Sequence, residues 1–495
     1  MKKNITALLL CAIMLSCFAS CGNSDGSPSV TDAAETSAQT TEETTEAGPA
    51  LELPADLDFG GEAVNIWYFT KNSDVSETFI DIAGELNGDV VDESLYYRNI
   101  KVEEALNIDL VFTDTGIGSS DVGAEIRKLI MSGSTDYDVY NVVQWNTAKY
   151  VTEGLFLNII DAPYIDIGKP WWSSYYINEI NIGDKNRYFL CGDISIDTVR
   201  CISCMYYNKS IYENYYGDAD GLYTTVLDGK WTIDRLAEYT EAVYSDLNGD
   251  DIANDGDRFG LMLNNYNNID VLFFGADNRI TGHDSDGMPY LTVNNERTSA
   301  FMQKLYSLCY ENMGTMMRKE GAGTLENTKG FNDGYSLFLT GFLYSSELLR
   351  DMPDDYGIIP PPKYDETQEN YRAVVHDIAT LICLPTTCQK LDTVSAALEM
   401  MAYESYKSVT PAYYETAMKT KYTRDEISSR IIDLIHDSNM TDMAYSYGDN
   451  FNGLGLTART MIASKKSDLA SFYATKEKSA LVKIGELIDK YTGLN

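Results

Sequence analysis

Apolar and polar residues follow two different periods along the chain from about residue 58 onward. Short apolar runs at 64–69, 108–112 and 137–143 have the length and composition of buried strands. Between them, 91–107 and 122–131 carry apolar residues at helical spacing. This strand–helix–strand–helix–strand order predicts a mostly parallel sheet with helices on both faces. A ligand of such a sheet is expected outside the carboxyl ends of its strands.

A second α/β region is predicted after residue 205, because the same kinds of pattern recur there. Its predicted strand is 259–263; from about residue 356 the pattern changes, and a further strand is predicted at 378–384. The predicted helices are 210–216, 231–245 with Thr232 as its cap, 298–312, 337–351 and 391–403. From about residue 400 to the end, the pattern is mainly helical.

The N-terminus has the three parts of a secretory signal: a basic start, an apolar run over 5–14 and small residues before Cys21. The tract Phe-Ala-Ser-Cys-Gly at 18–22 resembles a bacterial lipobox, with phenylalanine where leucine is usual. We therefore expect a signal peptide over 1–20, acyl chains on Cys21 and a location on the outer face of the cell membrane. The alternative is an ordinary signal with an incidental cysteine.

The segment that follows is acidic, and so is the whole chain. Residues 22–56 contain eight acids and neither lysine nor arginine, so 21–57 is predicted to be a disordered tether. Over all 495 residues, 38 basic residues against 75 acids give a net charge of −37. Such a field repels nucleic acid, which we exclude as a partner, and it argues against anionic ligands.

The positions of the cysteines indicate that they pack in the core and do not form a redox or metal site. Cys201 and Cys204 have the spacing of a redox or zinc pair, but residues three apart in the buried strand predicted there point to opposite faces. We interpret all the cysteines after Cys21 as small core residues. They are Cys191, Cys201, Cys204, Cys309, Cys383 and Cys388.

The clearest chemical motif is the acidic stretch 246–257, which has the oxygen spacing of a calcium loop. Asp251 stands where such loops usually have glycine, and the last ligand is an aspartate in place of the usual glutamate. We expect Ca²⁺ in a structural role; the alternative is an acidic turn between a helix and a strand. The expected ligands are Asp246, Asn248, Asp250, the Ile252 carbonyl, Asn254 and Asp257.

The motifs that mark common enzyme classes are missing from the sequence. It has no G-x-S-x-G, no H-E-x-x-H, no Walker loop and no G-x-G-x-x-G, and its three histidines are scattered. The paired carboxylates of a glycosidase stay open as an alternative, because 75 acids produce many accidental pairs. We expect a protein that binds its ligand without transforming it.

Four stretches of the chain resemble, in sequence and in order, segments of one known protein family. They are 206–212 (Tyr-Tyr-Asn-Lys-Ser-Ile-Tyr), 231–236 (Trp-Thr-Ile-Asp-Arg-Leu), 331–338 (Phe-Asn-Asp-Gly-Tyr-Ser-Leu-Phe) and 356–363 (Tyr-Gly-Ile-Ile-Pro-Pro-Pro-Lys). On these, the chain resembles the extracellular solute-binding proteins, family 1, of bacterial ABC importers, a group that includes maltose- and oligosaccharide-binding lipoproteins. The resemblance implies a type II periplasmic-binding fold: two α/β lobes joined by a hinge, with the ligand in the cleft between them.

The same resemblance implies the lobe boundaries and the function. Lobe one would comprise 58–204 plus 340–403, and lobe two 205–339 plus 404–495, with crossings near Met205, Leu339 and Tyr403. The protein would be a monomer that captures a small solute, expected to be a carbohydrate, by hinge closure and delivers it to the transmembrane subunits of an ABC permease. The alternatives are a sensory or adhesive surface protein and a surface glycosidase.

Candidate ligand residues follow from where aromatic rings and amides stand relative to the strands. Trp145 directly follows the strand predicted at 137–143, and Tyr266 follows 259–263, so both should lie at carboxyl edges and hold a sugar from opposite lobes. In the family, the stretch corresponding to 264–268 lines the cleft. Of two adjacent tryptophans in an extended segment, at most one can face the ligand. The candidates are Gln144, Trp145, Asn146, Asn264, Asn265, Tyr266, Trp171, Trp172 and Tyr344.

Overall fold

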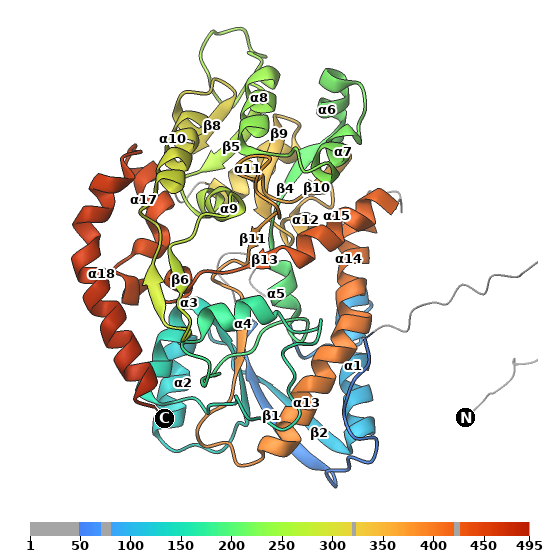
Figure 1. Ribbon diagram of the computed structural model, residues 1–495. Coiled ribbons are helices and arrows are strands. Elements are labelled where there is room, and N and C mark those ends of the chain that lie inside the picture. Colours follow the sequence, from blue (N-terminus) through green and yellow to red (C-terminus); the bar gives the residue numbers. More distant parts are fainter. Residues whose placement is uncertain (1–48, 71–80, 319–322, 420–425, 495) are drawn as a thin grey trace, which may run out of the picture. The chain divides into compact units, whose positions relative to one another are not determined.

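The computed structural model describes residues 49–70, 81–318, 323–419 and 426–494 (Figure 1). Residues 49–495 form one compact unit. The predicted signal peptide, Cys21 and the tether up to residue 48 lie outside the described residues. Among the helices described, none combines the length and the apolar character needed to cross a membrane.

The first lobe is built on a four-stranded sheet in the order β12-β3-β1-β2. The β1 strand pairs in parallel with β2 and β3, as the alternating pattern predicts, and β12 joins antiparallel to β3. Helix α1 begins where the Asp89 carboxylate accepts the Val91 and Asp92 N–H groups, and α13 packs against α1 and β1. The bounds are β1 Glu62–Tyr68, α1 Val90–Leu106, β2 Ile108–Asp114, α2 Val122–Met131, β3 Val139–Val143, β12 Thr380–Cys383 and α13 Leu391–Glu404.

The second lobe is built on a five-stranded mixed sheet in the order β10-β4-β9-β5-β8. Its strands β4, β5, β9 and β10 are buried along their whole length, and α8 and α11 pack against β5. The predicted cap is confirmed, because the Thr232 hydroxyl accepts the Arg235 N–H at the start of α8. The bounds are β4 Ser203–Asn208, α8 Ile233–Val243, β5 Phe259–Asn264, β8 Thr315–Arg318, α11 Gly323–Asn332, β9 Ser336–Phe342 and β10 Tyr356–Ile359.

Shorter elements and the C-terminal helices complete the fold (Figure 1). In lobe one and before the hinge these are α3 Gln144–Thr147, η1 Ala148–Glu153, α4 Ser174–Ile180 and α5 Ile196–Arg200. Between β4 and β10 they are α6 Lys209–Tyr216, α7 Gly221–Leu227, α9 Asn267–Gly275, β6 Thr281–His283, β7 Pro289–Leu291, α10 Glu296–Tyr310 and α12 Ser345–Leu348. After β10 they are β11 Ala373–Val374, η2 Ser405–Val409, α14 Thr410–Lys419, α15 Glu426–Asp437, β13 Asn439–Met440, α16 Met443–Ser446, η3 Gly448–Phe451, η4 Leu454–Leu456, α17 Thr457–Ala463 and α18 Leu469–Thr492.

Three chain segments lie side by side between the two sheets and form the hinge. The β11 strand pairs in parallel with β13, and Val375 bridges antiparallel to Ile202. The His376 N–H donates to the Cys201 carbonyl at 2.9 Å, which adds a further link between two of the segments. A few main-chain hydrogen bonds therefore join the lobes at this point, which is what a hinge requires.

The structure differs from the expected lobe boundaries at two places. The crossing expected near Tyr403 lies at β13, because η2 and α14 still pack against α1 of lobe one. Residues 340–403 were expected in lobe one, but β9 runs to Phe342 in the second sheet, and β10 pairs antiparallel with β4 in that sheet. The chain therefore crosses back at β11, between β10 and β12, and not near Leu339. The first crossing, at Ile202, lies close to its expected position at Met205.

The helix predicted at 337–351 is wrong. Residues 336–342 form β9, which lies between β4 and β5 and is buried on both faces; only 345–348 are helical. A central strand has no solvent face, so its apolar residues do not alternate with polar ones, and a continuous apolar run does not distinguish it from a buried helix.

The cysteines match the interpretation as packing residues. All six are free, five are buried and Cys388 is partly buried. Burial raises the pKa values of the Cys204 and Cys309 thiols well above the ordinary value of a cysteine, which keeps both thiols protonated and unreactive.

Candidate functional site

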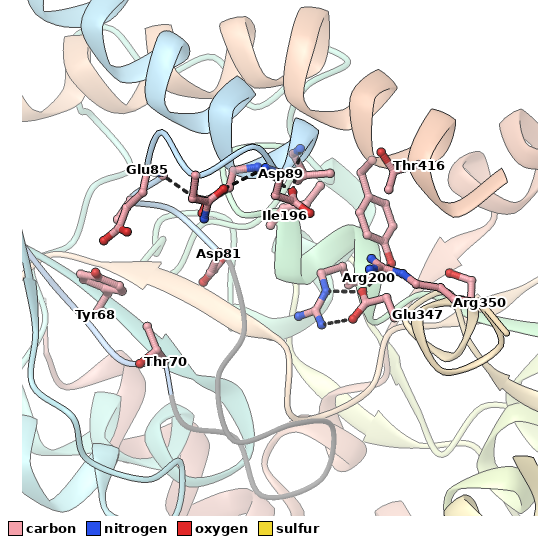
Figure 2. Close-up of a pocket in the computed structure, with 17 residues that line it drawn as sticks. Tyr68, Thr70, Asp81, Glu85, Asp89, Ile196, Arg200, Glu347, Arg350 and Thr416 are labelled. Atoms are coloured by element: carbon pink, nitrogen blue, oxygen red, sulfur yellow. Dashed lines mark hydrogen bonds and ion pairs between the residues drawn. The ribbon is translucent and has the colours of Figure 1, made fainter. Parts of the chain in front are cut away.

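A cavity of about 520 Å³ opens at the carboxyl end of β1, where the chain passes toward α1 (Figure 2). One wall comes from the end of β1, the start of α1 and α5, and the other from α12 and α14. The chemically active side chains around it are Tyr68, Thr70, Asp81, Glu85, Asn87, Asp89, Asp92, Arg200, Ser346, Glu347, Arg350, Tyr413 and Thr416. The volume is within the range of small-molecule sites.

Asp81 is the cavity residue whose carboxylate is held by the most hydrogen bonds. Its carboxylate is buried and accepts hydrogen bonds from the Ser195 hydroxyl at 2.5 Å, the Thr380 hydroxyl at 3.0 Å and the Asp197 N–H at 3.2 Å, with a further one from the Asn141 amide. These donors come from β3, from β12 and from the start of α5. One carboxylate thus holds three parts of lobe one in place, so the cavity wall is preorganised.

Arg200 joins α5 to α12 across the cavity. Its Nε and Nη2 donate to the two Glu347 carboxylate oxygens at 2.9 and 3.0 Å, and Nη1 donates to Asp197 at 3.2 Å. The Tyr413 hydroxyl donates to Glu347 as well, at 3.3 Å. Burial and the nearby Asp81 charge raise the pKa of Asp197 to about 7, although the Arg200 charge opposes them. Arg200 is therefore already engaged and acts as a structural tie rather than a free anion receptor.

The β1–α1 side of the cavity is acidic. Asp89 caps α1, and Asp92 accepts the Glu85 N–H at 2.8 Å together with the Asn87 amide. Burial, followed by the negative charges of Asp114, Glu85, Asp92 and Asp81, raises the pKa of Tyr68 to about 12. Tyr68 therefore presents a neutral ring and a hydroxyl beside several carboxylate oxygens, a combination that suits a polyhydroxylated ligand.

None of the nine sequence-predicted ligand residues lines this cavity. Of the group after β3, Trp145 keeps 44% of its surface exposed, whereas its neighbours are buried and bonded. The Gln144 amide donates to the Ser446 hydroxyl at 2.9 Å, and the Asn146 amide donates to the Ser119 carbonyl at 2.6 Å. Trp145 alone of this group is available to a ligand.

The second predicted group follows β5. The Asn264 side chain is buried and accepts the Tyr266 N–H at 3.0 Å, and the Asn265 N–H donates to the Arg318 carbonyl at 3.3 Å. The Arg459 guanidinium lies 4.0 Å from the centre of the half-buried Tyr266 ring. Tyr266 is therefore placed by a cation–π contact, and the Asn264 side chain supports the turn.

The structure does link the two predicted groups to one hinge segment. The Trp145 main-chain N–H donates to the Asp377 carbonyl at 3.1 Å. The ring of His376, the neighbour of Asp377, lies 3.3 Å from the side-chain amide of Asn267, one residue after Tyr266. That Trp145 and Tyr266 hold a sugar between them stays a prediction.

The three weaker candidates are buried. Trp171 and Trp172 both donate their indole N–H to the Glu399 carboxylate, at 2.9 and 2.7 Å. Tyr344 stacks on Phe342 with ring centres 5.4 Å apart. These side chains pack the interior, and we do not carry them into the site.

The acidic loop 246–257 is folded by its own hydrogen bonds. Asp246 accepts the Gly249 and Asp251 N–H groups at 2.6 and 2.9 Å, and the buried Asp257 accepts the Leu247 and Asn254 N–H groups. Asp251 has φ +57°, the left-handed conformation for which calcium loops use glycine. Across the described residues, no three His, Cys, Asp or Glu side chains are grouped to hold a metal ion. Calcium binding stays a prediction.

Some cavity residues could have been found from the sequence. Thr70 directly follows the first predicted strand, as Trp145 follows the third, and Tyr68 is the next-to-last residue of that predicted strand. Arg200 and Glu347 could not be predicted as cavity residues, because 147 positions separate these partners and neither belongs to a local motif.

Comparison with known proteins shows the fold. Neither a family model nor a curated protein matches the sequence. A cyclic alpha-maltosyl-1,6-maltose binding protein from Arthrobacter globiformis superimposes with a TM-score of 0.57 at 12% identity, over 86% of this chain and 100% of that one. A cyclo/maltodextrin-binding protein complexed with maltotetraose superimposes with a TM-score of 0.56 at 11% identity, over 86% of this chain and 97% of that one.

An ABC transporter solute binding protein from Thermotoga lettingae, bound with alpha-D-tagatose, gives a TM-score of 0.53 at 11% identity, over 86% of this chain and 100% of that one. The matches cover these proteins almost completely, so the chain has the whole two-lobed α/β fold of solute-binding proteins.

Proposed function

We propose that this protein is the solute-binding component of a bacterial ABC importer and that it captures a carbohydrate by closing its two lobes. The observation that carries the proposal is the cavity at the carboxyl end of β1, which is lined from both sides of the hinge by carboxylates, hydroxyls and a tyrosine ring. Carboxylate and hydroxyl groups bond sugar hydroxyls, and a tyrosine ring stacks on a pyranose face. Similarity to sugar-binding proteins supports the choice of ligand.

Two further features belong to the same proposal. A lipidated Cys21 would anchor the protein at the outer face of the membrane, and permease subunits would receive the ligand there. The mechanism involves binding and hinge closure without a covalent step. A sensory protein using the same lobes would need a partner to which no feature of the cavity points. A glycosidase would need carboxylates around a sugar, which the cavity has, but the similar sugar-binding proteins favour capture over hydrolysis.

A thermal-shift screen against a glycan library tests the proposal. A ligand at about 100 times its Kd raises the free energy of unfolding by about 2.7 kcal/mol. We expect at least one glycan to do so and calorimetry to give one site per chain. Stabilisation by no glycan would overturn the carbohydrate assignment, and release of reducing sugar would favour the glycosidase.

Alanine variants then locate the site. Tyr68→Ala tests the cavity, and Trp145→Ala and Tyr266→Ala test the pair predicted from the sequence. Loss of a buried stacking ring is expected to cost about 2 kcal/mol, roughly thirtyfold in affinity. Tyr290→Ala, which removes an exposed ring on β7, is the control and should leave the affinity unchanged. Wild-type affinity in Tyr68→Ala would place the ligand outside the cavity.

A further inference from the structure

The cavity holds more negative charge than its own cations balance. Of its acids, only Glu347 is ion-paired within the part of the chain that the structure describes, and its partner Arg200 is shared with a further acid, Asp197. The charged residues lining the cavity are Asp81, Glu85, Asp89, Asp92 and Glu347 against Arg200 and Arg350, and the buried Arg98, whose charge interacts with Asp81, is a further cation nearby.

These carboxylates do not mark an anion site. The start of α1 would suit an anion, but the Asp89 side chain already accepts its Val91 and Asp92 N–H groups. The exposed Arg350 lies on one side of the cavity, while Tyr68 and Glu85 lie together on the other (Figure 2). The Tyr68 side is therefore the negative end, and no cation among the described residues pairs with an acid there.

The Tyr68 side chain responds to the negative charge of the surrounding carboxylates. Its phenol stays neutral because burial and the surrounding carboxylates oppose ionisation. A neutral aromatic ring next to carboxylates attracts a cation through both the ring face and the negative charge. The hydroxyls of a neutral sugar can donate to these oxygens but leave the excess charge in place.

We infer that the carbohydrate bound in this cavity carries a protonated amine, as an amino sugar does, and that the amine lies at the end formed by Tyr68 and Glu85. The inference rests on the proposed function and specifies its substrate class. An ammonium group donates three hydrogen bonds and neutralises one unpaired carboxylate. Glu85 is the cavity carboxylate best placed for this, since it is exposed and no hydrogen bond to its side chain is recorded among the described residues.

The test compares sugars that differ only in charge. Mono- to tetrasaccharides of gluco, galacto and manno configuration are each measured by calorimetry as the amine, the N-acetylated amine and the plain hydroxyl form. At about pH 6 the amine is protonated. We expect the tightest-binding sugar to be an amine, preferred about tenfold or more over both neutral forms. Raising the salt concentration should reduce this preference.

Two variants with opposite charge changes locate the amine. Glu85→Gln should weaken binding of the amine about fivefold and leave the neutral forms unchanged. Arg350→Gln should leave the affinity for the amine equal or higher. Glu104→Gln, an exposed acid on α1 outside the cavity, is the matched control and should change neither.

The outcomes separate this inference from the proposed function. Neutral sugars that bind as tightly as their amines would overturn the inference and leave carbohydrate capture standing. Weaker amine binding in Arg350→Gln than in Glu85→Gln would overturn it too, because the ligand would then need an anionic group. If no sugar of any charge binds, the proposed function itself fails.

Discussion

Glu179 on α4 is a buried acid that meets the β6–β7 hairpin. The residue is only 8% exposed, and its carboxylate lies 3.8 Å from the His283 Nδ1 atom. Burial and the nearby Asp442 charge raise the pKa of Glu179 to about 8, against the opposing Arg279 charge, and burial lowers the pKa of His283. At neutral pH both groups are therefore uncharged where the hairpin meets α4.

This pair predicts a loss of stability with rising pH. The unfolded carboxyl group loses its proton above its ordinary pKa of 4.5, whereas the folded one keeps it to about 8, so folding becomes less favourable between these values. Glu179→Gln removes the titration. We expect calorimetric melting curves to show the variant more stable than wild type at about pH 8, by about 1–3 kcal/mol, with a smaller difference at about pH 5. Glu104→Gln should follow wild type, and parallel pH profiles for Glu179→Gln and wild type would contradict the assignment.

Position after a strand was the only signal in the sequence for single site residues. It selected Trp145, which is exposed beside the hinge segment at Asp377, and it applied equally to the cavity residue Thr70. Burial was not predictable for Trp171 and Trp172, because their partner Glu399 lies 228 and 227 positions away. Long-range hydrogen bonds of this kind leave no trace in local sequence.

Among the elements, helices with an apolar face were predicted best. The segment 122–131 forms α2 at the predicted bounds, and 91–107 forms α1 to within a residue at each end. The β9 strand was mistaken for a helix because it is buried on both faces and shows no alternation. Local pattern thus fails where an element has no solvent side to reveal its period.

The acidic loop between α8 and β5 carries the next prediction. If Ca²⁺ binds there, chelation should lower the melting temperature by a few degrees. Asp246→Ala should abolish this sensitivity, although it also removes the hydrogen bonds from Gly249 and Asp251. Sensitivity to chelator, measured within each variant, is therefore the quantity to compare.

Asp251→Gly provides the matched control for this loop. Glycine adopts the left-handed conformation at no cost and is the usual residue at this position, so the variant should keep or increase its calcium response. A wild-type melting curve that is unchanged by chelator would establish a plain acidic turn.

The two-lobe architecture of the whole molecule was predicted from the alternation of elements and the family resemblance. The position of the second crossing was not, because it depends on β10 pairing with β4, about 150 residues earlier in the chain. Strand order in a mixed sheet is set by such distant pairings, which short motifs do not encode.

Anchoring is a property of the whole chain and gives the last prediction. Cys21→Ala should remove the site of acylation and release the protein from the membrane fraction into the medium. Fractionation and immunodetection measure this, with Cys388→Ala, a partly buried cysteine of lobe one, as the control. A Cys21→Ala protein that stays with membranes after a salt wash would show that the anchor is not a lipid on this residue.

The way the second sheet is inserted in the sequence of the first determines the order in which the two sheets can be completed. All five strands of the second sheet come from 203–359, whereas the first sheet needs residues from 62 to 383, because its last strand, β12, follows the insertion. In a chain that emerges N-terminus first, lobe two has all its strands while β3 still exposes an unpaired edge. Such edges recruit other chains. The vulnerable interval in the maturation of this protein therefore lasts until β12 arrives.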